Sequence, residues 1–246
     1  MRVILFGACG RMGKELERLL SEEGSLHQVV AKVDACGGRG IYTSLSEVRE
    51  EADVIVDFSH HSATYALIDG ARAKKLPLVI ATTGHNEAEL AAIRSGAEHI
   101  PVFHSANMSM GVALQLRMAK EAARIFPHAD IEIVEKHHNR KLDAPSGTAL
   151  LLAQGIKEVR EEATFVYGRA GQHKRDPREI GIHALRMGSV IGEHDVILST
   201  DSETFTISHV AHSRSLFAEG AVSAAAFLCS QGAGLYTMKD MVGGDR

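Results

Sequence analysis

Apolar residues in the first hundred positions fall into five short runs separated by helical patterns. The runs are rich in Val, Ile and Leu, and each has the length of a buried strand. They occupy residues 2–8, 28–35, 52–59, 76–84 and 99–105. Helices are predicted between them, near 11–23, 62–74 and 86–97. Strands that alternate with helices predict a doubly wound parallel sheet, so we expect an α/β protein that begins with a Rossmann-type domain.

The pattern changes after a long predicted helix at 107–126. Strand-like segments then follow one another with turns between them, and one helix interrupts them near 147–162. The segments lie at 129–138, 179–194, 195–200 and 203–213. This order predicts a second, α+β domain with a mostly β, mixed sheet. We therefore expect a dinucleotide-binding domain at 1–108 and a substrate-binding domain at 109–213.

The remaining segment, 214–246, contains an Ala-rich run that predicts one helix ended by Gly232 and Gly234. We expect this segment to pack back on the first domain. Arg214 lies where the chain leaves the second domain. Two roles stay open for it: it clamps a substrate or bridges the domains, or it forms an ordinary surface ion pair.

The bulk composition excludes some classes of protein. With 246 residues, 45% of them apolar, the chain is long enough to bury real cores. Its formal net charge of -4 gives no cationic field for nucleic acid. A signal-peptide pattern and an apolar run of membrane-spanning length are both missing from the sequence, so we expect no membrane partner. Cys9, Cys36 and Cys229 form no C-x-x-C pair, and we expect three reduced thiols in a cytoplasmic protein.

The first predicted strand runs directly into the glycine-rich segment GACGRMG, residues 7–13, where a helix begins. Glycines at such a turn let the backbone approach a pyrophosphate, whose charge is met by the amides of the helix N-terminus. The spacing departs from the usual G-x-G-x-x-G, so a tight turn without a ligand stays an alternative. The position after a first strand favours a dinucleotide. The candidate contacts are Gly7, Ala8, Cys9, Gly10, Arg11 and Met12.

Asp34 ends the second predicted strand, where a carboxylate accepts hydrogen bonds from an adenosine ribose diol. A strand-terminal cap is the alternative role for it. A carboxylate repels a 2′-phosphate, and Ala35 follows it in place of an arginine, which favours NADH over NADPH. The nearby Arg39 weakens this preference, so NADPH stays possible.

Two further loops follow later strands, at the strand ends where open α/β sheets bind their ligands. Their small, hydroxyl and amide side chains are suited to the nicotinamide ribose and carboxamide, although plain turns have similar sequences. The candidate contacts are Ala81, Thr82, Thr83, Ser105, Ala106, Asn107 and Met108.

The segment EKHHNRKLDAPSGT, residues 135–148, concentrates cationic and donor groups in a chain that is negative overall. Adjacent strand residues point to opposite faces, so His137 and His138 are poorly placed to ligate one metal ion, and we expect no metal. A solvated charged turn is a simpler alternative. The residues that follow argue against it, because Ser146 has the character of a helix N-cap before ALLLAQGIKEV.

A helix that begins at Ser146 would present its first amides, at Gly147 and Thr148, to an anion. Lys141 adds a compact cation with rotatable donors, and His137 and His138 exchange protons near neutral pH. Together these residues predict a receptor for a small carboxylated substrate that takes up a proton.

The segment EKHHNRKLDAPSGTA, residues 135–149, resembles the long and specific signature of the dihydrodipicolinate reductase family. The resemblance covers almost the whole chain. It includes GACGRMG at 7–13, DFS at 57–59, TTG at 82–84, SANMSMGV at 105–112, IGIHALRMGSVIGEHDV at 180–196, HVAHSRSLFAEGA at 209–221 and GLYTMKDM at 234–241. It implies reduction of 4-hydroxy-tetrahydrodipicolinate to tetrahydrodipicolinate with NAD(P)H and loss of water, in bacterial lysine and diaminopimelate synthesis. It also implies a homotetramer assembled through the second domain's sheet.

Carried over position by position, the resemblance makes His137 a proton donor or acceptor and Lys141 the proton donor beside the reduced bond. His138, Gly147 and Thr148 would hold the substrate carboxylates, and the dinucleotide would lie on the loop residues given above. Hydride addition places negative charge on the neighbouring atom, so an acid at that atom lowers the barrier. We expect the two domains to close on each other for this reaction.

Two positions depart from the family pattern. His61 stands where D-F-[ST]-x-P has proline, so we expect a less rigid loop there. Ala81 replaces the first glycine of G-T-T-G, which alters the backbone approach to the cofactor.

Two rival functions share part of this pattern. Another two-domain nicotinamide dehydrogenase, acting on an amino acid or a sugar, would need the glycine loop but not the segment at 135–148. A dinucleotide-sensing binding protein would need neither an acid nor a lysine in the cleft.

Overall fold

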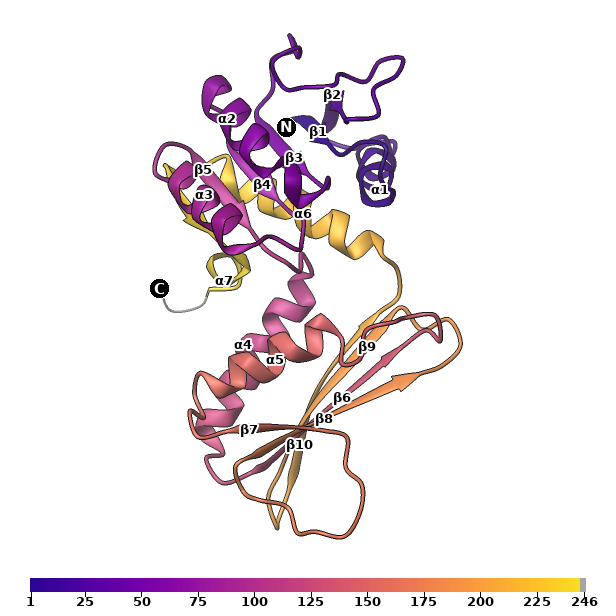
Figure 1. Cartoon of the computed structure of the whole chain (residues 1–246), viewed down its shortest axis with the longest axis vertical. Helices are drawn as coiled ribbons and strands as arrows, with labels where there is room; N and C mark the ends of the chain where they lie inside the picture. Colours follow the sequence, from indigo (N-terminus) through magenta and orange to yellow (C-terminus); the bar gives the residue numbers. More distant parts are fainter. Residues whose placement is uncertain (244–246) are drawn as a thin grey trace. The chain divides into compact units, whose positions relative to one another are not determined.

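The computed structural model describes residues 1–243 and separates the chain into two compact units. Unit 1 comprises Met1–Ser109 and the C-terminal segment that begins at Ser215, and unit 2 comprises Met110–Arg214. Each unit has its own sheet and its own cluster of buried apolar side chains. The fold is therefore mixed α/β with two independent cores (Figure 1).

Unit 1 is built on a six-stranded sheet in the order β11-β5-β4-β3-β1-β2, with parallel neighbours throughout. The strands are β1 (Arg2–Phe6), β2 (Gln28–Val33), β3 (Val54–Asp57), β4 (Leu78–Ile80), β5 (Pro101–His104) and β11 (Gly234–Tyr236). The helical elements are α1 (Arg11–Leu20), η1 (His61–Ala63), α2 (Thr64–Lys74), α3 (Glu87–Ala97), α6 (Ser215–Leu228) and α7 (Met238–Met241). The chain adds β2 on one side of β1 and β3 on the other, which creates the switch point at which such sheets bind ligands.

Helices cover both faces of the unit 1 sheet, because successive residues of a strand point to opposite sides. Val102 of β5 packs in the apolar cluster that contains residues of α2 and α3. The next residue, Phe103, instead lies with its ring 6.4 Å from the ring of Phe227 in α6. Helix α6 also packs against α1, so these two helices share the second face.

The C-terminal helix is shorter than the sequence predicts. It ends at Leu228, and the chain then forms β11 beside β5 before the short helix α7. Pairing with β5 satisfies backbone groups that would otherwise be exposed at the edge of the sheet. The ring of Tyr236 also lies 5.7 Å from that of Phe227. These tertiary contacts determine the conformation after Leu228, where local sequence alone suggested more helix.

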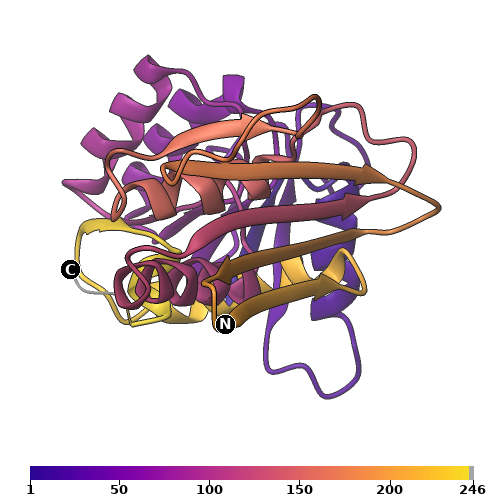
Figure 2. The ribbon, with the colours of Figure 1, turned by 90° about the horizontal axis from the view of Figure 1, so that it is seen from below.

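Unit 2 contains a five-stranded mixed sheet in the order β10-β9-β6-β8-β7. Its strands are β6 (Asp130–His137), β7 (Thr164–Tyr167), β8 (Glu179–Arg186), β9 (Gly192–Ser199) and β10 (Thr204–Ala211), which lie side by side in Figure 2. Strand β8 pairs in parallel with β6 and β7, whereas β9 is antiparallel to β6 and β10. Helices α4 (Met110–Ile125) and α5 (Gly147–Lys157) pack their apolar residues into one cluster with the sheet. The predicted mixed sheet is confirmed.

Three details of unit 2 differ from the sequence prediction. The segment predicted at 179–194 is interrupted, because β8 ends at Arg186 and β9 runs from Gly192 to Ser199. Helix α5 ends at Lys157 rather than near 162. Strand β7 was not predicted, because it has four residues at the edge of the sheet, all at least partly exposed, and therefore lacks a clear apolar pattern. Within residues 1–243, no helix is long and apolar enough to span a membrane.

Strand β6 positions the site. Its odd-numbered residues are buried, and Ile131 and Ile133 belong to the core beneath α4 and α5. The same face continues with Glu135 and His137, which are also buried. The buried face of β6 thus changes from apolar side chains to ionisable ones at the C-terminal end of the strand, beside the beginning of α5.

Candidate active site

Helix α5 begins as the sequence predicts. Ser146 is its N-cap, with a β-region backbone, and its hydroxyl accepts a hydrogen bond from the amide of Ala149. Such a bond satisfies one of the amides that a helix start leaves without an intrahelical partner. The backbone amide of Ser146 donates to Oε1 of Glu135 at 3.0 Å. The end of β6 and the start of α5 are therefore fixed to each other by a buried carboxylate.

Glu135 is the centre of a buried network. Its side chain is fully buried and receives a two-pronged interaction from Arg186 of β8, with both N–O distances 2.8 Å. Oε2 of Glu135 also lies 2.6 Å from Nδ1 of His137. Arg186 in turn donates to the carbonyl of Asp143, in the loop that leads to α5. The carboxylate of Glu135 thus connects β6 and β8 to the start of α5, and Arg186 connects them to the loop before α5.

These partners determine the protonation of the network. Burial raises the pKa of Glu135, but the hydrogen bonds from Arg186, His137 and the Ser146 amide outweigh it and hold the pKa below its ordinary value. Glu135 is therefore ionised at neutral pH and accepts a hydrogen bond from the Nδ1–H of His137. The opposite ring nitrogen, Nε2, is then the one that is left to face a ligand. A side chain at Gly192 would come within 3.1 Å of this nitrogen, so the glycine keeps Nε2 clear.

His194 of β9 lies beside His137, with the ring centroids 5.2 Å apart. Burial, followed by the neighbouring His137, lowers the pKa of His194 to about 4. Its Nε2 lies 3.0 Å from the hydroxyl of Ser146. His194 is therefore neutral at physiological pH and adds no positive charge beside His137.

The adjacent His138 lies among positive charges. Partial burial and the charges of Arg140 and Arg214 lower its pKa, and His137 and Lys141 add to the effect. These cations gather in one part of unit 2, as the sequence predicts for an anion receptor. Arg214 is exposed and contributes to this local positive potential.

Lys141 lies in the loop between β6 and α5, half-buried, with Nζ 2.8 Å from Oδ1 of Asp143. The lysine holds the pKa of Asp143 below its ordinary value. Its ammonium group is therefore partly neutralised in this structure, and a ligand carboxylate would compete with Asp143 for it. The sequence did not predict this pair.

Gly147 and Thr148 occupy the first turn of α5, as predicted. Gly147 is exposed, and a Cβ placed on it would meet no atom within 4 Å. The helix N-terminus therefore has open space in front of Gly147, on the same loop as Lys141. A helix start of this kind, with the positive end of the helix dipole, is suited to a carboxylate.

The predicted dinucleotide residues of unit 1 lie between β1 and α1. Gly7 has a φ of 85°, and a Cβ on it would come within 2.6 Å of the backbone of Phe58 and Ser59. A Cβ on Gly13 would come within 2.2 Å of the carbonyl oxygen of Gly7. The N-cap of α1 is Gly10, which offers no side-chain cap. The first-turn amides of α1 are thus left for another acceptor, which fits a phosphate group.

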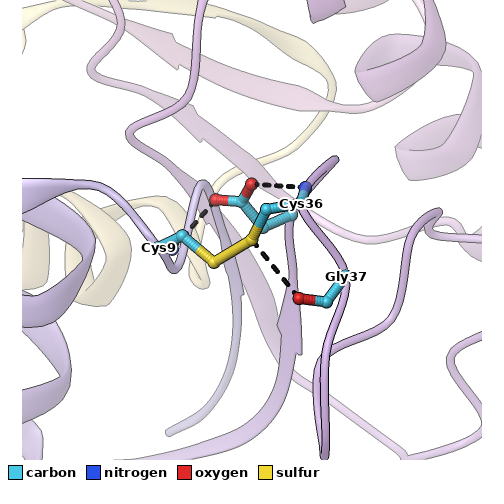
Figure 3. The surroundings of a disulfide bond; sticks show 4 residues. Cys9, Cys36 and Gly37 are labelled. Atoms are coloured by element: carbon cyan, nitrogen blue, oxygen red, sulfur yellow. Dashed lines mark hydrogen bonds between the residues drawn. A yellow bond between two sulfur atoms is a disulfide. The ribbon is translucent and has the colours of Figure 1, made fainter.

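Asp34 lies next to the glycine loop, as predicted, but its carboxylate already has two partners. Oδ2 accepts from the amide of Cys9 at 2.9 Å, and Oδ1 accepts from the amide of Cys36 at 3.1 Å. The two cysteines are joined by a disulfide (Figure 3). The prediction of three reduced thiols is therefore wrong for Cys9 and Cys36, because the loops after β1 and β2 bring them together. Among residues 1–243, Cys229 is the one free cysteine.

Within residues 1–243, a single group of three or more potential metal ligands is close enough to share an ion: Cys9, Asp34 and Cys36, with ligand atoms within 4.8 Å of one another. In the disulfide form the two sulfur atoms are bonded to each other, so they do not offer two thiolates. His137 and His138 are not part of this group.

The two remaining loops lie at the carboxyl ends of β4 and β5, as predicted. In the first, Thr82 is buried, whereas Ala81 is half-buried and Thr83 exposed. In the second, the hydroxyl of Ser105 donates to the carbonyl of Asn107, which fixes the turn. The rest of that loop comprises Ala106, which is exposed, and Met108, which is buried.

His61, the residue that replaces the family's proline, is held by other means. Its Nδ1 lies 2.9 Å from Oε1 of Glu89, and its ring lies 4.2 Å from that of His60. This contact with Glu89 of α3 restrains the loop in place of the fixed φ of a proline.

Sequence reasoning missed Glu135, Arg186 and His194 as site residues. A signal for Glu135 was available, because it lies two residues before His137 and two-residue spacing places both on one face of a strand. Nothing local indicates Arg186 or His194, which are 51 and 48 residues from their partners Glu135 and Ser146.

Unit 1 has a parallel sheet with a switch point and a glycine loop. Unit 2 has a mixed sheet and a histidine that is oriented by a carboxylate. These features define a pyridine-nucleotide oxidoreductase of two units. Residues 1–108 match the N-terminal domain of dihydrodipicolinate reductase, and residues 111–242 match its C-terminal domain. The chain therefore belongs to the dihydrodipicolinate reductase family.

Individual relatives agree with this membership. A protein of Caldanaerobacter subterraneus named 4-hydroxy-tetrahydrodipicolinate reductase is 49% identical over 98% of this chain and 98% of its own. One of the same name from Clostridium tetani is 41% identical over 98% and 97%. A solved dihydrodipicolinate reductase from Paenisporosarcina sp. TG-14 shares the fold, with a TM-score of 0.80 and 23% identity over 98% of this chain and 99% of that one.

Proposed function

We propose that this protein reduces 4-hydroxy-tetrahydrodipicolinate to tetrahydrodipicolinate with NAD(P)H and loss of water, as a step of lysine synthesis through diaminopimelate. The observation that carries the proposal is the ionised Glu135 that orients His137 beside the cationic loop of Lys141. Family membership over both units supports it. A pure binding protein would have no use for a proton-exchanging group held in this way.

The substrate class follows from the charges of unit 2. A ring dicarboxylate would place one carboxylate at the open N-terminus of α5, near Gly147 and Thr148, and would meet His138 and the arginines around it. The Paenisporosarcina relative was solved with dipicolinate, a compound of this class. Lys141 would leave its ion pair with Asp143, bind the substrate instead, and donate a proton beside the reduced bond.

His137 would transfer a proton through Nε2, because Nδ1 is engaged by Glu135. The positive charge that appears on the ring during transfer is stabilised by the carboxylate next to it. General acid help of this kind contributes about 10²–10⁴ in rate.

The nicotinamide cofactor fits the glycine loop of unit 1 and would supply the hydride. The residues that would hold it are the uncapped first turn of α1, the loop residues 7–12, and Asp34 for the adenosine ribose. The loops at 81–83 and 105–108 would contact the nicotinamide end. An acid at position 34 favours NADH, since it repels the 2′-phosphate of NADPH.

We also propose a homotetrameric assembly and a cytoplasmic location, both of which follow the family pattern. Helices α4 and α5 cover one face of the unit 2 sheet, and a homotetramer would use the other face, where Lys136 pairs with Glu193. A cytoplasmic location follows from the need for NAD(P)H and for a substrate made from metabolites.

The experiment follows NADH absorbance after the condensation product of aspartate semialdehyde and pyruvate is supplied. We expect rapid oxidation by the wild type. His137→Ala and Lys141→Ala should lose most turnover, by about 10²-fold or more, with NADH affinity little changed. The exposed His173→Ala serves as the matched control. Absence of wild-type turnover with both NADH and NADPH would remove the assignment.

A further inference from the structure

The disulfide joins two loops that have different tasks in the proposed cofactor site. Cys9 lies in the glycine loop, two residues before α1 begins, and Cys36 lies two residues beyond Asp34. The cysteines are 27 positions apart in sequence, and both donate their backbone amides to the one carboxylate of Asp34. Figure 3 shows the sulfur bridge between the two cysteines. The bridge therefore connects the proposed pyrophosphate loop to the segment that follows Asp34.

An adenosine ribose needs the space between these two loops. It is covalently linked to the pyrophosphate, which would lie along residues 7–13, and its diol would bind Asp34. The ribose must therefore lie between the glycine loop and the segment after β2. The Cys9–Cys36 bond crosses from one of these to the other, and both oxygens of Asp34 are occupied by the cysteine amides.

From this arrangement, and resting on the proposed function, we infer that Cys9 and Cys36 form an oxidisable dithiol site that closes the adenosine half of the cofactor site when it is bridged. In the reduced state the loop after β2 is free to withdraw. Gly37, Gly38 and Gly40 all have positive φ, at 59°, 141° and 74°, so this loop is built from residues with the widest backbone freedom.

The bridge forms by exchange with a disulfide, either a small molecule such as oxidised glutathione or a redox protein. Cys36 is exposed, so its thiolate attacks the incoming disulfide first, and one thiol leaves. The half-buried Cys9 then attacks the sulfur of Cys36 in the mixed disulfide and releases the second thiol. The two protein thiols lose two electrons and two protons in all, and the incoming disulfide gains them as two thiols. A dithiol reverses the reaction.

The test measures NADH affinity of the full chain in two redox states. The protein is treated with dithiothreitol or with oxidised glutathione, in the presence of EDTA so that no divalent cation protects the thiolates. Mass spectrometry of the peptides verifies the bridge. We expect the dissociation constant for NADH to be at least about tenfold higher in the bridged protein and to recover after dithiothreitol.

Two variants serve as controls. Cys36→Ser removes one partner, and its NADH affinity should not respond to oxidised glutathione. Cys229→Ser removes the free, exposed cysteine and should respond as the wild type does. A response that disappears with Cys229 would show that another thiol is responsible, and would overturn the inference.

The outcomes separate this inference from the proposed function. Reduced protein that turns over substrate, together with bridged protein that binds NADH equally well, overturns the switch and leaves the reductase in place. Failure of oxidised glutathione to bridge the cysteines also overturns it. If the reduced protein binds neither NADH nor NADPH, the proposed function and the switch both fall.

Discussion

Glu135 and His137 lie on the same face of β6, with Oε2 of the glutamate 2.6 Å from Nδ1 of the histidine. The glutamate is fully buried and is bound from the other side by Arg186. The pair fixes both the orientation of the imidazole ring and the nitrogen that carries its proton. In the proposed reaction Glu135 is thus a positioning residue, since it would act on the substrate through His137.

Glu135→Gln should lower kcat. The amide keeps the size of the side chain but removes the negative charge that stabilises protonated His137, so we expect a decrease of up to about 10²-fold. The limb of the pH–rate profile that reports the proton on His137 should also shift to lower pH, because the protonated ring loses the neighbouring negative charge. Steady-state kinetics at several pH values measures both effects.

Glu203→Gln is the matched control, because Glu203 is exposed in the turn between β9 and β10. Its kinetics should equal those of the wild type. A Glu135→Gln variant with normal kcat and an unaltered pH profile would show that the carboxylate only stabilises the fold.

The stability of the protein should fall as the pH falls from about 6.5 to about 4. Burial, then His137, lowers the pKa of His194 to about 4, so in this range the unfolded chain binds a proton that the folded chain does not. His104 in unit 1 behaves in the same way, since burial and His85 lower its pKa to about 4. Denaturant unfolding at pH 7 and pH 5 measures the change.

In His194→Gln, the loss of unfolding free energy between pH 7 and pH 5 should be smaller than in the wild type, by about 1–2 kcal/mol. His173→Gln, at an exposed position, should leave the pH dependence unchanged. An equal loss in the wild type and in His194→Gln would contradict the role given to burial.

Ser146→Ala should destabilise unit 2. It removes the N-cap of α5 and the hydroxyl beside His194, and loss of a cap costs about 1 kcal/mol, with up to 2 in well-ordered proteins. Thermal and urea unfolding measure the difference. Ser202→Ala, at an exposed turn, should change stability by less than about 0.5 kcal/mol. Equal effects of the two substitutions would argue against the cap.

Asp34→Asn should reduce the preference for NADH over NADPH. The substitution removes the charge that repels a 2′-phosphate and weakens acceptance of hydrogen bonds from the ribose. We expect the ratio of kcat/KM for the two cofactors to move towards NADPH by about tenfold, which corresponds to about 1.4 kcal/mol. The assay uses reduced protein, so that the cysteine bridge does not interfere. An unchanged ratio would mean that another residue discriminates between the ribose of NADH and the phosphorylated ribose of NADPH.

Local patterns were sufficient for most of the secondary structure. Strands β1 to β5 contain short apolar runs, and Ser146 is a residue type favoured at a helix N-cap, so these strands and the start of α5 were predictable. Strand β7 and the segment after Leu228 were not, because edge pairing decides them. At these sheet edges a short segment becomes a strand because its backbone pairs with the neighbouring strand. The local sequence pattern does not indicate that pairing.

The site was predictable where its residues are neighbours in sequence. The segment 135–148 supplies the histidines, the lysine and the helix start together. The network around Glu135 depends on Arg186, which is 51 positions away, and on the register between β6 and β8. The cysteine pair depends equally on the meeting of two loops. Contacts of this kind are set by tertiary structure, which a single sequence does not reveal.

The place of α6 and β11 in unit 1 has a consequence for the order of folding during synthesis. Unit 2 is one continuous stretch, so all of its strands have left the ribosome by the time residue 214 emerges. The sheet of unit 1 lacks its edge strand and one of its covering helices until the chain has grown past Tyr236. Domains generally fold as units during translation. During synthesis the N-terminal part of unit 1 therefore keeps some of its apolar surface uncovered until the C-terminal segment emerges. Unit 2 is able to complete its fold before unit 1 does.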